Sequence, residues 1–259
     1  MRKRLQLTVI ALLAVALCAG IAVLLTYRSL KHVPPFYDQA LAANSVKQEI
    51  ASEELGSRAT ALYNDVRLRQ KWEALFTDEQ INGFLAVDLP EKHPRLLPKD
   101  VREPRVAITP EHVTLGFQVE AGGVATIFSV EADVYLSEPN VIALHLQGAR
   151  AGRLPLPLQK VLDQISVAAQ RLKIPLRWAQ SDGDPVALLT IEPTSPRGKH
   201  RMRLETLELH DGEVYVSGSS QKRRRGGEEA PTGSEPLPGH PSRAPDVASG
   251  PSGIKVYRQ

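Results

Sequence analysis

The pattern of apolar and polar residues divides the chain into an uncharged apolar run, a helical region, a β-rich region and a polar tail. Residues 5–26 contain no charged side chain. As a helix this run would measure about 33 Å, which matches a bilayer hydrocarbon core of about 30 Å. Basic residues before the run predict a cytoplasmic amino terminus (residues 1–4), with everything after about residue 30 outside the cytoplasm.

A cleaved signal peptide is the competing interpretation of the apolar run. Signal peptides have an apolar core of roughly 7–15 residues, followed by small residues at the cleavage site. Here residues 21–25 (IAVLL) continue the run beyond the small residues, which favours an uncleaved membrane anchor from Leu5 to Thr26. A lipoprotein anchor at Cys18 requires a small residue before the cysteine, whereas Leu17 stands there.

Residues 35–75 predict a juxtamembrane helical spacer. After Pro34-Pro35 no proline occurs until residue 90, and apolar side chains recur at helical spacings, which indicates one or two amphipathic helices with an interruption near Gly56. A dimeric coiled coil is the alternative, although its heptads are irregular. Thr77 and Gln80 have the spacing of a capping box, which predicts the start of a further helix at TDEQINGFLA.

After the proline-rich connection, the apolar period changes to two, which predicts β-strands. Three segments show this alternation, namely residues 112–120, 124–136 and 142–147. Turns at Gly122-Gly123 and Pro139-Asn140 join them into an antiparallel meander with one dry apolar face and one solvated polar face. Further along the chain, residues 186–191 (VALLTI) predict a strand covered on both sides, and Asp211-Gly212 predicts the turn of a hairpin over residues 200–219.

The segment between the meander and the next helix is rich in special backbone residues. Gly148 and Gly152 allow a bulge or a sharp bend, and Pro155 and Pro157 exclude a central strand. Residues 158–172 then carry a broad apolar stripe of helical period. We therefore expect an α+β domain over residues 76–220, in which a curved antiparallel sheet packs on this crossing helix.

Charge and composition remove several classes of function. The net charge of +3 comes from the two ends of the chain, because residues 1–30 carry +4, residues 31–220 carry −4 and residues 221–259 carry +3. A mildly acidic domain does not predict a nucleic-acid surface. Residues 221–259 are rich in Gly and Pro, which predicts a disordered tail. Its basic run at residues 222–225 is either a solvated charge run or a contact with anionic envelope polymer or lipid.

Candidate chemistry is sparse. The seven histidines show no metal-ligand spacing on a predicted helix, and the single Cys18 provides no thiolate pair. Phosphate loops and nucleophile elbows are absent from the sequence. The acidic cluster at residues 182–185 fits a turn better than a calcium or magnesium site. We therefore predict no catalytic residue, no metal and no cofactor, and a hydrolase is the least favoured hypothesis.

Eight residues of the capped helix and of the glycine-proline joint follow a shared pattern, namely Phe76, Thr77, Asn82, Leu85, Gly152, Leu154, Pro155 and Leu158. With the basic start, the single apolar run and the meander, they make residues 70–220 resemble the YpmS-like family of bacterial membrane-anchored proteins, a largely uncharacterised group. The layout is also similar to tubular lipid-binding envelope proteins, in which a curled sheet wraps a long helix around an apolar groove. That second likeness concerns architecture only.

Two functions follow as expectations for a single-pass protein of the cell envelope. In the first, the extracytoplasmic domain binds a lipid, an acyl chain or another apolar ligand in a groove between sheet and helix. The residues predicted to line this groove are Val113, Leu115, Phe117, Val119, Phe128, Val130, Leu144, Leu146, Val161, Leu162 and Ile165. In the second, the same residues form a solid core, and the protein is a structural or assembly component that acts through envelope protein partners.

Overall fold

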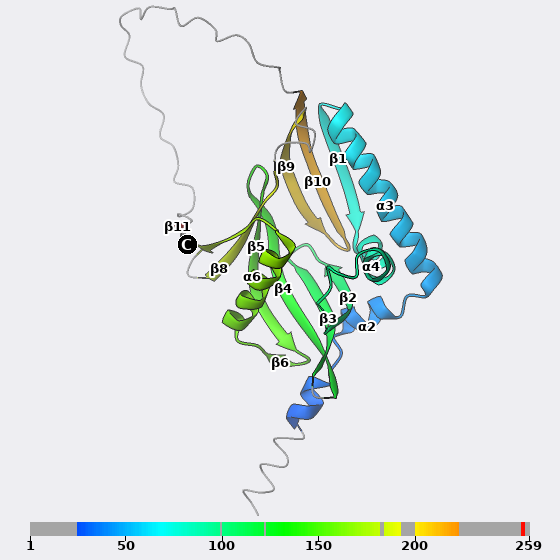
Figure 1. Cartoon of the computed structure of the whole chain (residues 1–259), viewed down its shortest axis with the longest axis vertical. Coiled ribbons are helices and arrows are strands. Elements are labelled where there is room, and N and C mark those ends of the chain that lie inside the picture. The colour runs from blue at the N-terminus through cyan, green and yellow to red at the C-terminus, as the bar shows by residue number, and fades with distance from the viewer. Residues whose placement is uncertain are drawn as a thin grey trace, which may run out of the picture.

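The computed structural model describes residues 25–98, 100–121, 123–181, 184–192, 200–222 and 255–256. Two antiparallel sheets and a set of helices make the fold α+β, as predicted (Figure 1). The helices are α2 (Pro35–Leu41), α3 (Ser45–Leu68), α4 (Asp78–Ala86), α5 (Asp88–Lys92) and α6 (Leu158–Leu172). The strands are β1 (Lys71–Thr77), β2 (Val101–Ile108), β3 (Val113–Ala121), β4 (Val124–Glu138), β5 (Val141–Ala151), β6 (Leu154–Pro155), β7 (Leu176–Ser181), β8 (Asp184–Thr190), β9 (His200–His210), β10 (Glu213–Lys222) and β11 (Lys255–Val256).

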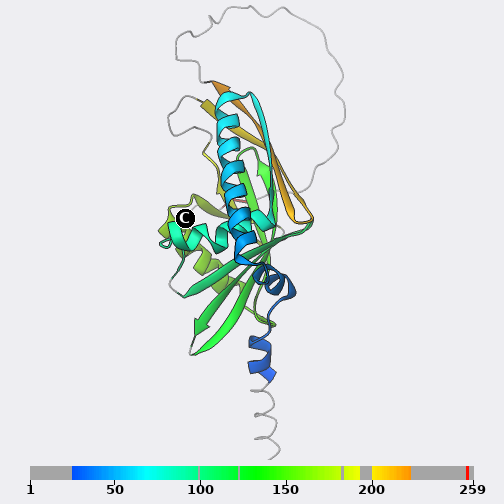
Figure 2. The same ribbon diagram turned by 90° about the vertical axis from the view of Figure 1, so that its right-hand side faces the viewer.

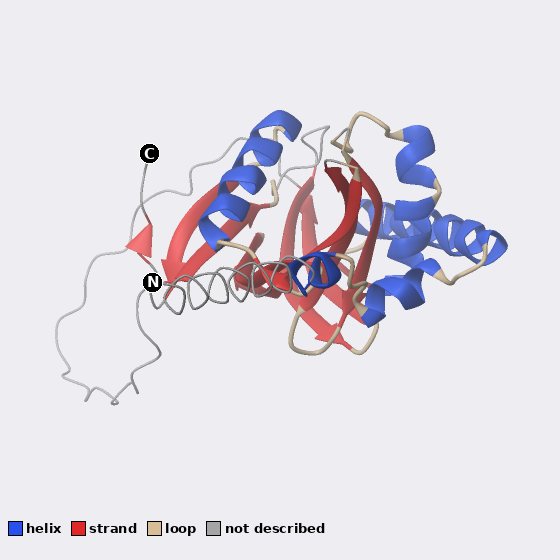
Figure 3. Cartoon of the chain, turned by 90° about the horizontal axis from the view of Figure 1, so that it is seen from below, coloured by secondary structure: helices blue, strands red, loops and turns tan. Residues whose placement is uncertain are grey.

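The larger sheet has the strand order β11-β7-β8-β5-β4-β3-β2, with β6 paired to β5, and the smaller sheet has the order β1-β10-β9. Strands β2 to β5 are consecutive antiparallel neighbours, so the predicted meander is present. Figure 3 shows helices on both faces of the larger sheet, and Figure 2 shows α3 running along the smaller sheet.

The predicted turns lie where the local sequence placed them. Pro139-Asn140 connects β4 to β5, and Asp211-Gly212 connects β9 to β10. Asn140 and Gly212 have φ values of +67° and +72°. Glycine and asparagine tolerate this left-handed region better than other residues, so these turns are specified locally.

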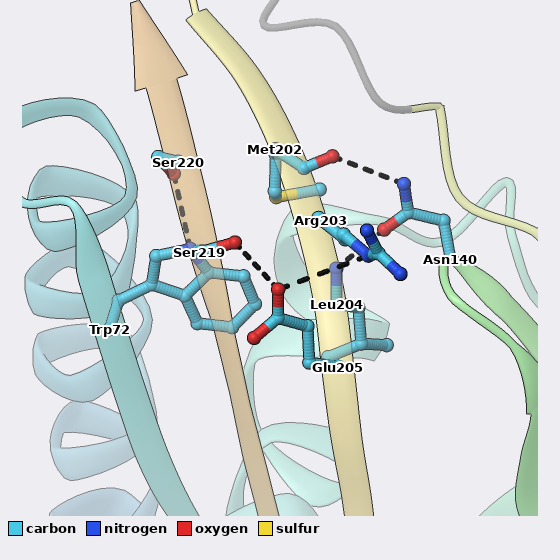
Figure 4. Close-up of polar contacts among 8 residues, drawn as sticks. All are labelled: Trp72, Asn140, Met202, Arg203, Leu204, Glu205, Ser219 and Ser220. Atoms are coloured by element: carbon cyan, nitrogen blue, oxygen red, sulfur yellow. Dashed lines mark hydrogen bonds and ion pairs between the residues drawn. The ribbon is translucent and has the colours of Figure 1, made fainter. Parts of the chain in front are cut away.

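The predicted helical spacer over residues 35–75 is wrong at its carboxyl end. Helix α3 ends at Leu68, and β1 follows as a strand of the smaller sheet. The sequence KWEALFT fits a helix in isolation, and pairing with β10 decides its conformation. The Trp72 indole Nε1 donates a 3.1 Å hydrogen bond to Ser220 Oγ in the interior (Figure 4).

Helix α3 packs closely on α4 and so belongs to the fold. A Cβ atom added to Gly83 of α4 would lie 2.6 Å from the backbone nitrogen of Ser52 in α3. Helix α4 begins with the predicted capping box, in which Gln80 N donates to Thr77 Oγ1 and Thr77 N donates to Gln80 Oε1. The small residue and the capping box fix the position of α4 beside the sheet.

Two asparagine side chains bond to strands at the ends of the two sheets. Asn82 of α4 donates from Nδ2 to the Val106 carbonyl of β2 (2.8 Å) and accepts from Val106 N (2.7 Å). Asn140 donates to the Met202 carbonyl of β9 (3.1 Å) and accepts from Leu204 N (2.6 Å; Figure 4). Each amide satisfies backbone groups that an edge strand would otherwise leave unpaired.

The glycine-proline joint, predicted to form a bulge or a sharp bend, contains a bulge within β5 and a bend directly after it. The register shift between β4 and β5 leaves Gln147 unpaired next to Gly148. Gly152 has φ +58°, and a Cβ at this position would overlap the carbonyl oxygen of Ser29. Arg153 N donates a 3.0 Å hydrogen bond to the same carbonyl. The joint therefore holds the segment that follows the predicted anchor.

Among the described residues, no helix is both long and apolar enough to span a bilayer. The span expected from Leu5 to Thr26 lies outside the described residues except for its last two positions, which are helical together with residues 27–30. Most of the tail predicted over residues 221–259 also lies outside the described part of the chain.

Candidate apolar site

The strand register places the eight sheet residues predicted to line a groove on one face of the larger sheet. Directly paired residues of antiparallel strands share a face. Leu115 of β3 pairs with Val130 of β4. Leu146 of β5 pairs with Ala132, two residues along β4 from Val130 and therefore on the same side. This surface, the apolar sheet face, consists of Val113, Leu115, Phe117, Val119, Phe128, Val130, Leu144 and Leu146.

Helix α6 lies on the same face, over β7. Leu144 pairs with Ala187 of β8, and Ala187 pairs with Trp178 of β7, so Trp178 belongs to this face. The Trp178 indole Nε1 donates a 2.8 Å hydrogen bond to Ser166 Oγ of α6. Leu162 of α6 is buried nearby. The helix therefore covers the apolar sheet face at the β7 side.

The part of the apolar sheet face on β3 and β4 is more open. Leu115 is 41% exposed, whereas Leu146 on β5 is 5% exposed. Between these extremes, Phe117 and Phe128 are half-buried and stack with ring centroids 6.0 Å apart and planes 8° apart. An apolar strip at the middle of a sheet is thus only partly covered by protein.

The expectation that the opposite, more polar face is solvated is wrong on β3. Thr114 is 7% exposed and Gly116 is buried. The reason is α2, since a Cβ on Gly116 would approach Tyr37 Cδ2 to 2.8 Å and the Phe36 ring almost as closely. Tyr37 is fully buried there. Further along the opposite face, a small aliphatic core forms from Ala143, Ala179, Val186 and Leu188.

Contacts with backbone groups mark the two ends of the apolar sheet face. The Arg171 guanidinium at the end of α6 donates from Nη2 to the Arg95 carbonyl (2.9 Å), in the connection between α5 and β2. At the other end of the strip, Phe128 pairs with Ala151, next to the Gly152 turn that contacts Ser29. One end of the strip therefore lies beside the segment that leads to the predicted anchor.

The three groove residues predicted on α6 do not share one environment. Leu162 faces β7 and lines a depression of about 740 Å³ between α6 and β7, the outer groove. Its lining comprises Gln159, Leu162, Asp163, Ser166, Val167, Trp178, Ala179, Gln180 and Pro185. Val161 and Ile165 are half-buried and do not line the outer groove. Leu162 therefore lies on the β7 side of the helix, and Val161 and Ile165 lie outside the outer groove.

Sequence reasoning missed Trp178, the residue that joins the sheet to α6. Its signal is the alternation of Leu176 and Trp178 in LRWAQS, which places both on one face of a short strand. The small residues Ala149 and Ala151 also belong to the apolar sheet face by register. They escaped notice because alternation of large apolar residues is the stronger pattern.

A polar cluster on the opposite face contains His145. Its Nδ1 lies 3.7 Å from Asp133 Oδ2, and its Nε2 lies 3.7 Å from Asp184 Oδ2. The two carboxylates lie next to different nitrogens of the ring. They therefore cannot bind one metal ion together with a single ring nitrogen. In the described part of the chain, no group of three His, Cys, Asp or Glu side chains is arranged to hold a metal. Asp182 lies outside the described residues.

A buried cation lies under α2. Arg105 is 5% exposed, its Nη1 donates to the Pro104 carbonyl (2.7 Å), and its Nε has no hydrogen-bond partner among the described residues. The Tyr37 hydroxyl donates to the Glu103 carbonyl (2.8 Å), where a bulge gives Glu103 a φ of +49°. Burial, followed by the negative charge of Glu103, raises the pKa of Tyr37 to about 12. Burial also lowers the pKa of Arg105.

Comparison with protein-family models, with curated proteins and with solved structures finds no match to this chain. The resemblance to the YpmS-like family therefore stays a prediction.

Proposed function

We propose that this protein is a single-pass, membrane-anchored envelope protein whose extracytoplasmic domain binds the acyl chain of a lipid on the apolar sheet face. The anchor is Leu5–Thr26, with the amino terminus in the cytoplasm. In this proposal the larger sheet is curved with its apolar face concave toward α6, and the acyl chain lies along β3 and β4 beside the helix.

The observation that carries the proposal is the exposure of Leu115 at the middle of a continuous apolar strip. Leu115 is 41% exposed although its sheet neighbour Val130 is also apolar. Scattered exposed apolar residues are ordinary, whereas a contiguous apolar strip in a concave site is typical of a binding surface. From Val113 to Val119 the strip measures about 20 Å at roughly 3.3 Å per residue, a length suited to a long alkyl chain.

The position of the strip relative to the anchor supports a lipid as the ligand. The Phe117–Phe128 end of the strip adjoins Ala151 and the Gly152 turn, and this turn contacts Ser29. With the anchor in the bilayer, this end of the strip is the nearer one to the membrane surface. An acyl chain then enters from the bilayer without crossing water, because its apolar surface exchanges one apolar environment for another.

The proposal is tested by photo-crosslinking in membranes that contain the full chain. A benzophenone amino acid is placed at Leu115 in one variant and at Tyr135 in a matched control. Tyr135 is 37% exposed, close to the exposure of Leu115, and its pairing with Ala143 places it on the opposite face. After irradiation, the purified protein is analysed by mass spectrometry for covalently attached lipid.

We expect lipid adducts at position 115 and at least tenfold fewer at position 135. A discrete protein adduct at position 115 in place of lipid would overturn lipid binding and support the envelope assembly function. Equal lipid labelling at both positions would show contact with bulk lipid only, and absence of any adduct at position 115 would show that the strip is not a binding surface.

A further inference from the structure

The outer edge of β7 pairs with the carboxyl end of the chain. Strand β11 lies antiparallel to β7, with Lys255 opposite Gln180 and Val256 opposite Ala179. Without β11, β7 would be the last strand of the larger sheet and would present unpaired backbone groups. Exposed edges of this kind accept extended peptides by strand addition.

The outer groove runs beside this same edge. Gln180 and Ala179, the two residues that pair with β11, both line the groove between β7 and α6. Trp178 and Asp163 line the groove as well. A peptide added to β7 therefore meets an aromatic surface and a negative charge, in addition to the free backbone.

The end of the chain has the composition of such a peptide. Residues 226–253 contain few large apolar side chains, whereas the last six residues, IKVYRQ, combine Ile254, Val256 and Tyr257 with two cations. β-Branched and aromatic residues favour strands, and the cations complement the carboxylate of Asp163.

We propose that residues 252–259 are a tethered strand that docks in cis on the β7 edge and occupies the outer groove. Residues 223–254 connect β10 to β11. A chain of that length reaches at most about 110 Å at roughly 3.3 Å per residue, which exceeds the width of a domain of this size. The docked strand covers the sheet edge and keeps it from pairing with other chains. This inference does not depend on the ligand of the apolar sheet face.

The test is hydrogen–deuterium exchange of the β7 segment, residues 176–181, in the purified full-length chain. Val256→Pro removes the backbone N–H at a position paired with β7, so strand pairing is prevented there. Val247→Pro introduces the same residue into the connecting segment and is the matched control. We expect exchange of the β7 segment to be about tenfold faster in Val256→Pro, from loss of about one hydrogen bond, and unchanged in Val247→Pro.

A chain that ends at Pro251 provides the second arm of the experiment. The synthetic peptide SGIKVYRQ is expected to restore slow exchange of β7 in this truncated chain. Equal exchange in the wild type, Val256→Pro and the truncated chain would overturn the proposal. Protection that disappears on tenfold dilution of the wild type would assign the strand to a second copy and overturn docking in cis.

Discussion

Asn140 is expected to hold the two sheets together. It lies in the turn between β4 and β5 with φ +67° and is 9% exposed. Its side-chain amide bonds to the Met202 carbonyl and to Leu204 N, its backbone nitrogen donates to the Leu204 carbonyl (3.3 Å), and its own carbonyl accepts from Ile191 N (2.8 Å). The turn of the larger sheet thereby joins the edge of the smaller one.

Asn140→Ala removes both side-chain hydrogen bonds and leaves the buried Leu204 N–H and the half-buried Met202 carbonyl without these partners. Each orphaned group costs about 1–3 kcal/mol, and alanine in the left-handed region costs about 1–2 kcal/mol more than asparagine or glycine. We therefore expect the free energy of unfolding to fall by about 3–8 kcal/mol. Asn140→Gly removes the same bonds without the backbone strain, so its loss is expected to be about 1–2 kcal/mol smaller.

Urea unfolding followed by tryptophan fluorescence measures this effect and also locates it. Trp72 lies on β1 of the smaller sheet and Trp178 on β7 of the larger sheet, and these are the two tryptophans of the chain. Versions that retain one tryptophan therefore report each sheet separately. In single-tryptophan chains that keep Asn140, we expect the unfolding transitions of the two sheets to coincide. In single-tryptophan chains with Asn140→Ala, we expect the two midpoints to separate.

A loss below about 0.5 kcal/mol, the range of ordinary surface substitutions, would refute this reasoning. Coincident transitions in Asn140→Ala together with a large loss would show that the two sheets are coupled through other contacts. Either result would remove the assignment of Asn140 as the link between the sheets.

Two further predictions concern the segment next to the anchor. Gly152→Ala combines a left-handed backbone with a Cβ that overlaps the Ser29 carbonyl, so we expect the contact to break and trypsin to cleave faster at Lys31. Gly123→Ala is the control, because Gly123 has φ +78° but open space around it. Equal cleavage in both variants would contradict the prediction. The pKa of Tyr37 is about 12 in the folded chain, above the unfolded value of 10.0. The buried hydroxyl therefore stabilises the folded state below pH 10, and about 2–3 kcal/mol of the free energy of unfolding is lost as the pH rises toward 12. Tyr37→Phe is expected to remove this part of the alkaline loss in pH-dependent urea titrations, and an unchanged slope would show that the hydroxyl is not buried.

The sequence alone specified elements whose signals lie within a few residues. The capping box at Thr77 and Gln80, the Asp211-Gly212 turn and the alternation in β3 and β4 are present in the structure. These signals act through local dihedral preferences and through the period of the side chains, so no distant partner is needed to interpret them. The shared face of the predicted groove residues on β3, β4 and β5 follows from the same periodicity.

Tertiary structure alone decided what covers each face and where β1 lies. The polar face of β3 is buried because Tyr37 and Phe36, far away in sequence, pack over Gly116. Residues 71–75 form a strand because β10 pairs with them across more than 130 residues. Leu115 stays partly exposed because α6 packs on β7, where Trp178 binds Ser166. Periodicity identifies the side of a strand on which a residue lies, but coverage of that side depends on contacts between distant segments, which no local pattern encodes.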